Sequence, residues 1–288
     1  MKHYVSLLRI HQYVKNLFIF LPVFFGLQIT NLPILLKTAA AFLAFCLTAS
    51  AVYIFNDYFD CEDDRKHPVK KDRPLASGAV SKKTALVLTG FLAAAGLAGS
   101  FAVDPAILAI VLVYIVVNIL YTVALKHVAI IDVMVIAIGF VLRLFIGSAA
   151  SGVQLSMWII IMTFLLALFL AFAKRREDVL LYLEKGEKAR KVIDGYNMEF
   201  LNVSMIIMSA VIVISYIMYT ISPVILSRNH GDKIYLTVIW VILGVLRYLQ
   251  QTMVFNSTGS PTKTLLKDHF LQLVIVGWII SFWVLIYL

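Results

Sequence analysis

The sequence has few charged residues and few cysteines. Charged side chains make up 14% of the 288 residues and hydrophobic ones 61%, above the roughly 45–50% of a soluble domain. The two cysteines, Cys46 and Cys61, give neither a disulfide framework nor a metal-binding spacing, and none of the six histidines shows one. These shortages exclude a disulfide-stabilised domain and a zinc site. The apolar excess predicts a membrane protein.

Long polar stretches are also scarce, so no large soluble domain fits between the apolar segments. The apolar runs approach the roughly 20 residues that cross a bilayer as a helix, and they lack the alternation of barrel strands. We therefore predict an all-α polytopic membrane protein, a single domain over 1–288 with nine transmembrane helices. The windows lie near 17–36, 38–56, 84–102, 105–124, 129–150, 156–173, 201–222, 233–252 and 270–288. "LPVFFG" and "TNLP" interrupt the first window.

Positive charge is concentrated in alternate connections. The N-terminus, the loop 57–83 and the loop 174–199 carry 3, 7 and 7 Lys and Arg residues. The positive-inside rule places all three in the cytoplasm, and nine spans then put Leu288 outside. The run after the basic N-terminus lacks the small-residue cleavage site of a signal peptide. The net charge of +9 is attributed to these loops and to anionic ligands in a lipid bilayer, not to nucleic acid.

The densest charge follows the second window, in "NDYFDCEDDRKHPVKKDRP" (56–74). If the second span continues as a helix, Asp57, Asp60 and Asp64 are spaced i, i+3, i+7 and lie on one helical face. Neighbouring carboxylates repel one another, and a bound Mg²⁺ would relieve that repulsion. The alternative is a solvated helix end whose acids are neutralised by nearby Lys and Arg. The spacing alone leaves both interpretations open.

The following loop favours the metal site. Lys70, Lys71 and Arg73 lie within ten residues of Asp64, and Pro68, Pro74 and Gly78 indicate a shaped loop. Carboxylates that hold a metal, followed by cations for phosphate oxygens, suit a metal–diphosphate complex.

The block "NDYFDCEDDRKHPVKKDRPLASG" fits NDxxDxxxD, and the chain thereby resembles the UbiA superfamily of intramembrane prenyltransferases. It looks most like the polyprenyl-phosphate phosphoribosyltransferase branch. The stretches that carry this further resemblance are "HQYVKNLFIFLP" (11–22), "YTVALKHVAIIDVMVIAIGFVLRLFIG" (121–147), "AFAKRRED" (171–178) and "RYLQ…GSPTKTLLKDHFLQ" (247–272). The resemblance implies a UbiA-like bundle, Mg²⁺, a phosphoribosyl diphosphate donor and a polyprenyl phosphate acceptor.

One departure bears on the donor. Aromatic prenyltransferases of the superfamily carry a second Asp-rich motif, where this chain offers Asp132 alone, with Ile136 four residues on. A sugar diphosphate held by one Asp cluster and basic residues fits this better than a prenyl diphosphate does.

The resemblance also implies the site residues. Asp57, Asp60 and Asp64 are expected to be catalytic metal ligands, and Asn56 to orient them. The expected substrate-binding residues are Lys15, Lys70, Lys71, Arg73, Tyr121, Lys126, Asp132, Arg143, Lys174, Arg175 and Arg247. A bacterial plasma-membrane location and a product for cell-wall or glycolipid synthesis are implied too, and homo-oligomerisation is left open.

Several of these residues have a second interpretation. Lys126 can be an interfacial lysine, and Arg143 can bind a lipid phosphate or form an internal salt bridge. Lys174 and Arg175 can be positive-inside anchors. Arg247 can bind phosphate, and Asp268, which follows it along the chain, is expected to cap or order its loop.

The sequence leaves three functions open for the whole chain. The favoured one is phosphoribosyl transfer to a polyprenyl phosphate, which needs no strong general base because the acceptor is already ionised. This agrees with the absence of a Ser/His/Asp or Cys/His set. The first alternative is an aromatic prenyltransferase that uses a polyprenyl diphosphate. The second is a transporter in which Asp132 and Arg143 line an ion path.

Overall fold

The computed structural model describes residues 2–66, 70–186, 191–227, 231–256 and 261–287. All regular elements within these ranges are helices, which confirms the all-α prediction. Eight described helices are long and apolar enough to cross a membrane. They are α3 (Leu32–Phe59), α5 (Lys82–Val103), α6 (Pro105–Val123), α7 (Ile131–Ser151), α8 (Met157–Lys185), α9 (Met198–Thr220), α11 (Val238–Met253, preceded by η5, Gly231–Thr237) and α13 (His269–Tyr287).

The first of the nine expected spans is not one helix. Residues 17–36 are divided among a 3₁₀ helix, η1 (Ile10–Phe20), the short α2 (Leu21–Phe25) and the first turn of α3. Pro22 lies in the first turn of α2, Gly26 ends that helix, and Leu27 has a left-handed φ of 59°. Because this backbone cannot continue a helix, the count of nine spans is not confirmed.

The chain divides into two compact units. Unit 1 comprises Met1–Lys126 and Ile138–Leu155, and unit 2 comprises His127–Ala137 and Ser156–Leu288. Helix α7 therefore begins in unit 2 and ends in unit 1. The single domain over 1–288 stays a prediction, and each unit is described by itself. The shorter elements are α1 (Lys2–Leu8), α4 (Cys61–Lys66), η2 (Lys70–Asp72), η3 (Leu125–His127), η4 (Lys191–Gly195), α10 (Pro223–Leu226) and α12 (Pro261–Lys267).

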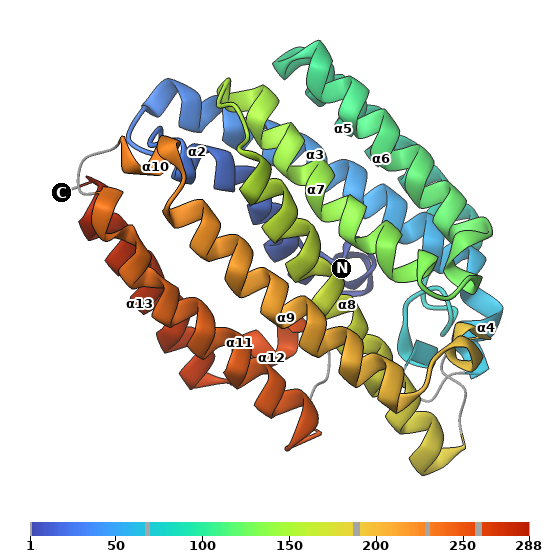
Figure 1. Cartoon of the computed structure of the whole chain (residues 1–288). Helices are drawn as coiled ribbons and strands as arrows, with labels where there is room; N and C mark the ends of the chain where they lie inside the picture. The colour runs from blue at the N-terminus through green and yellow to red at the C-terminus, as the bar shows by residue number, and fades with distance from the viewer. Residues whose placement is uncertain (1, 67–69, 187–190, 228–230, 257–260, 288) are drawn as a thin grey trace. The chain divides into compact units, whose positions relative to one another are not determined.

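Unit 1 is built on α3, which packs against α5, α6 and η1. Helices α5 and α6 lie side by side (Figure 1) and meet at Asp104, whose side chain caps α6 by accepting from the Ala106 N–H. Gly96 permits the close approach of α5 to α3, because a Cβ there would lie 2.3 Å from the Thr48 hydroxyl. Small residues at such crossings are typical of membrane helices.

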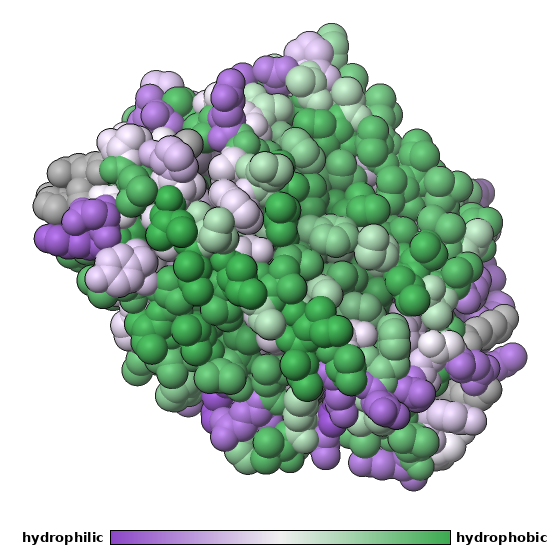
Figure 2. Space-filling model, viewed as in Figure 1, coloured by the Kyte–Doolittle hydropathy of each residue, from purple (hydrophilic) through white to green (hydrophobic). Residues whose placement is uncertain are grey.

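Unit 2 is built on α8 packed against α9 and on α11 packed against α13. Ser156 caps α8 by accepting from the Ile159 N–H, and α8 ends at Gly186 with a left-handed φ of 69°. Figure 2 shows hydrophobic residues over the α11 and α13 helices of this unit, and Leu246 and Leu273 are among the exposed ones. Such exposed apolar surface is suited to contact with lipid.

Candidate functional site: an aspartate cluster balanced by cations

Asp57 and Asp64 are brought together by one guanidinium. Asp57 lies in the last turns of α3 and Asp64 lies in α4, and their side chains are 3% and 5% exposed. Arg73 Nη1 donates to Asp57 Oδ1 at 3.0 Å and to Asp64 Oδ2 at 2.6 Å. Of the three cations predicted in this loop, Arg73 is therefore placed directly on the acidic cluster.

Asp60 lies between these two residues in sequence but has other partners. It ends α3, and its backbone N–H still bonds to the Asn56 carbonyl. Its carboxylate pairs with Lys126 and accepts from Asn56 Nδ2 at 2.9 Å. Asn56 is held in turn by Thr122, whose hydroxyl donates to Asn56 Oδ1 at 3.2 Å. The predicted residues Asn56 and Lys126 thus meet Asp60 in unit 1.

Arg9 is a member of this cluster that the sequence did not reveal. Its guanidinium pairs with Asp57 and lies 5.5 Å from the centre of the Tyr53 ring. Its backbone is left-handed, with φ of 53°, between α1 and η1. A strained non-glycine residue at a charged site is often part of its preorganisation. The sequence indicates Arg9 only as one of the positive charges of the N-terminus, since it lies 48 positions from Asp57.

The carboxylates of the cluster fit Mg²⁺ only in part. Asp57 and Asp64 fit a hard divalent cation, because one nitrogen bonds to both carboxylates and could give way to an ion. Asp60 faces Lys126, and within the described ranges no group of three or more His, Cys, Asp or Glu residues is arranged to hold a metal. The predicted three-carboxylate set is therefore assembled only in part in this conformation.

Four predicted ligands of unit 1 lie in neighbouring elements. Lys70 and Lys71 are in η2, the former half-buried and the latter exposed. Tyr121 is half-buried in the last turn of α6, next to Thr122, the residue that contacts Asn56. Lys15 is half-buried in η1, next to Asn16.

Arg143 is buried in unit 1 without a carboxylate among its described contacts. Its Nε donates to Asn16 Oδ1 at 2.9 Å and its Nη1 donates to the Gly139 carbonyl at 2.6 Å. The rings of Phe45, Tyr114 and Phe140 lie 4.9, 5.4 and 5.3 Å from its guanidinium carbon. Among the described residues Arg143 therefore forms no salt bridge, because aromatic faces and neutral acceptors surround the cation.

Unit 2 holds a second ionic cluster, in which the side chains of Asp132 and Arg175 are each 1% exposed. Arg175 Nε donates to Asp132 Oδ2 at 2.6 Å, and its Nη1 donates to Asp178 Oδ2 at 2.5 Å. The Tyr196 hydroxyl donates to Asp132 Oδ1 at 2.5 Å. Burial and the bond to Asp132 raise the pKa of Tyr196, which keeps its hydroxyl protonated near neutral pH. The predicted pair Asp132 and Arg175 is thus internally satisfied. Lys174 is half-buried beside Arg175.

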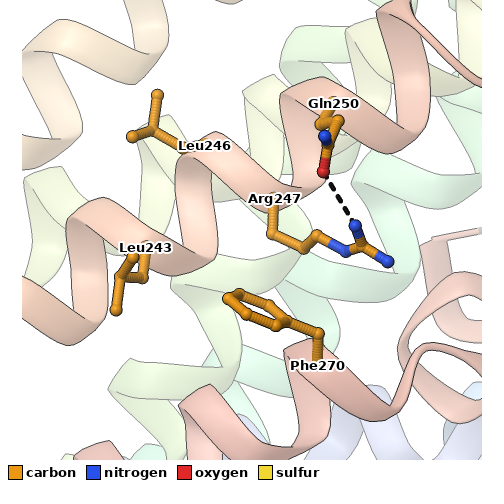
Figure 3. A pocket seen from close by; sticks show the side chains of 5 residues that line it. All are labelled: Leu243, Leu246, Arg247, Gln250 and Phe270. Atoms are coloured by element: carbon orange, nitrogen blue, oxygen red, sulfur yellow. Dashed lines mark hydrogen bonds between the residues drawn. The ribbon is translucent and has the colours of Figure 1, made fainter.

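Arg247, also in unit 2, lines an open hollow of about 310 Å³ with Leu243, Leu246, Gln250 and Phe270 (Figure 3). Its Nη2 donates to Asp268 Oδ2 at 2.8 Å. Asp268 also accepts from the Leu271 N–H at 2.8 Å at the start of α13, which confirms the predicted cap. Burial raises the pKa of Asp268, but hydrogen bonds from Arg247 and Leu271 outweigh it and hold that pKa below its usual value.

These features define a class: an all-helical polytopic membrane protein with an aspartate and cation cluster at the end of a spanning helix. The model of the UbiA prenyltransferase family matches residues 17–182. The chain belongs to the UbiA prenyltransferase family of membrane transferases.

Full-length relatives and solved structures agree with this assignment. The chain is 30% identical to the decaprenyl-phosphate phosphoribosyltransferase of Mycolicibacterium smegmatis, over 96% of this chain and 89% of the relative. It is 31% identical to the protein of the same name from Corynebacterium glutamicum, over 99% and 86%. A UbiA homologue from Archaeoglobus fulgidus, bound to DMAPP and Mg²⁺, superposes with a TM-score of 0.74 at 22% identity, over 99% of both chains.

Proposed function

We propose that this protein transfers the phosphoribosyl group of phosphoribosyl diphosphate to a polyprenyl phosphate of the decaprenyl type and releases diphosphate. The observation that carries the proposal is the nearly full-length similarity to relatives named decaprenyl-phosphate phosphoribosyltransferase. The cluster of Asp57, Asp60 and Asp64 with its attached cations supports it, since both ligand types of a metal–diphosphate complex lie together.

The site would bind the donor by exchange of partners. In the structure, Arg9 and Arg73 neutralise Asp57, Arg73 neutralises Asp64, and Lys126 neutralises Asp60. Mg²⁺ would be held by Asp57 and Asp64, joined by Asp60 once Lys126 turns away, and would neutralise the leaving diphosphate. The three cations released from the carboxylates would then bind phosphate oxygens. Lys70 and Lys71 extend the same positive loop.

The transfer itself needs little proton chemistry. The bond between C1 of the ribose and the diphosphate oxygen breaks, and the electron pair leaves with diphosphate. A phosphate oxygen of the polyprenyl phosphate forms the new bond to C1 from the opposite face. Because a phosphate monoester is ionised near neutral pH, no side chain has to remove a proton. The work of the site residues is to position two anions and to stabilise the departing charge.

The acceptor would lie in the lipid-facing part of the site. Arg143 carries a buried positive charge with no carboxylate among its described contacts. Half-buried Lys15 directly precedes Asn16, which accepts a hydrogen bond from Arg143. This favours the phosphate-binding interpretation of Arg143, with the polyprenyl tail between apolar helices. We also propose that the N-terminus and the loops 57–83 and 174–199 face the cytoplasm of a bacterium, where the soluble donor is available, and that the C-terminus lies outside.

A radiolabel assay tests the function directly. Protein in detergent or vesicles is given labelled phosphoribosyl diphosphate and polyprenyl phosphate, with Mg²⁺ or with a chelator. A second arm supplies prenyl diphosphate and an aromatic acid, which is the donor and acceptor pair of the alternative function. Labelled ribose in the lipid phase, dependent on Mg²⁺, is expected only in the first arm. Transfer only in the second arm would establish an aromatic prenyltransferase instead.

A matched pair of variants ties the activity to the cluster. Asp60→Ala removes the partner of Lys126 and is expected to abolish turnover while the protein remains folded in the membrane. Asp63→Ala, an exposed acid in the same block, is the control and is expected to keep full turnover. Unchanged turnover in Asp60→Ala would contradict the assignment of the cluster as the active site.

A further inference from the structure

A threonine of α6 bonds to a residue of the aspartate cluster. The Thr122 hydroxyl donates to Asn56 Oδ1 at 3.2 Å, although the two residues lie 66 positions apart. Thr122 is 3% exposed and lies in the last turn of α6, and Asn56 lies in the last turn of α3. Both helices belong to unit 1, and they pack against each other. The bond therefore joins the ends of two spanning helices.

This hydrogen bond differs from the usual one of a helical threonine. Thr38, Thr48 and Thr89, in α3 and α5 of the same unit, each donate to the carbonyl four residues earlier in their own helix. That local bond is common for a threonine inside a helix. Thr122 instead directs its proton to a side chain of another helix. Its hydroxyl is thus oriented by the cluster and not by its own backbone.

Donors and acceptors follow a fixed order from Thr122 to Asp60. An ionised carboxylate only accepts hydrogen bonds, so the amide nitrogen of Asn56 has to face it. Asn56 Nδ2 accordingly donates to Asp60 Oδ2 at 2.9 Å, and the amide oxygen is left for the Thr122 hydroxyl. A flipped amide would turn its oxygen toward the carboxylate, where two acceptors repel each other. The Thr122 hydroxyl, as a donor, opposes that flip.

This arrangement assigns different partners to the two oxygens of Asp60. Asn56 bonds to Oδ2, whereas Lys126 pairs with Oδ1. The Asp60 side chain is 25% exposed, and the side chains of Asp57 and Asp64 are 3% and 5% exposed. Asp60 is therefore the most accessible carboxylate of the three. When Lys126 turns away in the proposed exchange of partners, Asn56 would still hold Oδ2, and Oδ1 would be open to a metal ion.

We infer that Thr122 is a positioning residue of the aspartate cluster, which acts through Asn56 to fix the Asp60 carboxylate for Mg²⁺ and its bound diphosphate. This inference rests on the proposed function, in which Asp60 joins the metal ligands. The Thr122 hydroxyl sets the orientation of the amide, and the amide holds the carboxylate. Outer hydrogen-bond partners of this kind orient the ligands of a metal and raise its affinity.

Thr122→Val and Thr122→Ser separate the hydroxyl from the shape of the side chain. Valine keeps the branched shape but cannot donate, whereas serine keeps the donor. Thermal unfolding in lipid nanodiscs is measured against Mg²⁺ concentration, with inorganic diphosphate held constant. The Mg²⁺ midpoint, which is the concentration at half-maximal stabilisation, should rise roughly fivefold in Thr122→Val, less than the about tenfold or more that follows loss of a direct partner of a metal ligand. Thr122→Ser should stay within about twofold of the wild type.

Thr38→Val is the matched control, because it removes a buried hydroxyl that donates within its own helix. Its Mg²⁺ midpoint should equal that of the wild type. A merely structural role of Thr122 would lower the melting temperature alike without ligand and at saturation, and would leave the midpoint unchanged. Thr122→Ala removes the same hydroxyl with a smaller side chain, and it takes the place of Thr122→Val if the valine variant does not fold.

A double-mutant cycle tests whether Thr122 acts through Asn56. In the Asn56→Ala background the hydroxyl has no amide to orient, so Thr122→Val should shift the Mg²⁺ midpoint no further. A further shift of similar size in that background, or an unchanged midpoint when the Thr122 hydroxyl is removed, would overturn the inference and leave the proposed function intact. A wild type that Mg²⁺ and diphosphate do not stabilise would overturn it as well. If they stabilise the wild type but no phosphoribosyl group is transferred, the proposed function fails while the positioning of Asp60 stands.

Discussion

Substitution of Arg73 by Met tests the charge balance of the aspartate cluster. The variant keeps an apolar stem of similar length but removes the guanidinium that bridges two carboxylates. Asp57 then retains Arg9, whereas Asp64 loses its one ion pair among the described residues. Both carboxylates remain almost fully buried. In this variant the buried carboxylate of Asp64 has no cation to compensate its charge.

The size of the effect follows from burial. Removal of one partner of a buried ion pair costs about 3–5 kcal/mol of unfolding free energy. Because the Arg73 side chain is 28% exposed, solvent screening reduces this to about 2 kcal/mol. Mg²⁺ should compensate for the missing cation. A ligand at about 100 times its Kd adds about 2.7 kcal/mol, so Mg²⁺ should return Arg73→Met close to the stability of the ion-free wild type.

Thermal unfolding in lipid nanodiscs, with Mg²⁺ and with a chelator, measures both quantities. The stabilisation by Mg²⁺ should be larger in Arg73→Met than in the wild type, where the ion must first displace Arg73. Arg65→Met is the matched control, because Arg65 pairs with Glu62 at the exposed surface, where such pairs contribute at most about 1 kcal/mol. Equal stabilisation of wild type and Arg73→Met by Mg²⁺ would refute the exchange of cation for metal at this site.

Two further predictions concern residues outside the aspartate cluster. The lowered pKa of Asp268 means that its contribution to stability is present above the unfolded pKa and is lost as the pH falls through the lower folded value. Asp268→Asn should therefore flatten the acid limb of the stability curve, measured by unfolding across pH, and an unchanged acid limb would contradict this. Arg143→Met should raise the KM for polyprenyl phosphate roughly tenfold and change the melting temperature little. A lowered melting temperature with unchanged KM would give Arg143 a structural role.

Much of the fold could be predicted because it is determined by local composition. Continuous apolar runs of about 20 residues specify membrane helices without reference to distant residues. The exception is the N-terminal segment, whose average hydropathy resembles that of a span. There Pro22 and Gly26 divide the helix, and the positive φ of Leu27 depends on contacts that hydropathy does not report.

Only those contacts of the site that join residues a few positions apart in the sequence could be predicted. The i, i+7 relation of Asp57 and Asp64 is a local property, and the structure places them on one cation. The partners Arg9 and Lys126 lie 48 and 66 positions from the acids that they contact, so no spacing in the sequence indicated these pairs. Tyr196 was missed for the same reason, since its partner Asp132 lies 64 positions away.

The pairing of Asp57, Asp60 and Asp64 with cations constrains how a ligand can enter. A metal ion alone would meet Arg73 between Asp57 and Asp64, and a diphosphate alone would meet three carboxylates. Each ligand by itself therefore opposes charges of its own sign, whereas a metal–diphosphate complex offers the cation to the carboxylates and the anion to Arg9, Arg73 and Lys126. Under the proposed function, such a site would favour the complex over either component, because only the complex would replace every ion pair that it breaks. If the proposed function holds, one aspartate cluster with three matched cations would be sufficient for a single diphosphate.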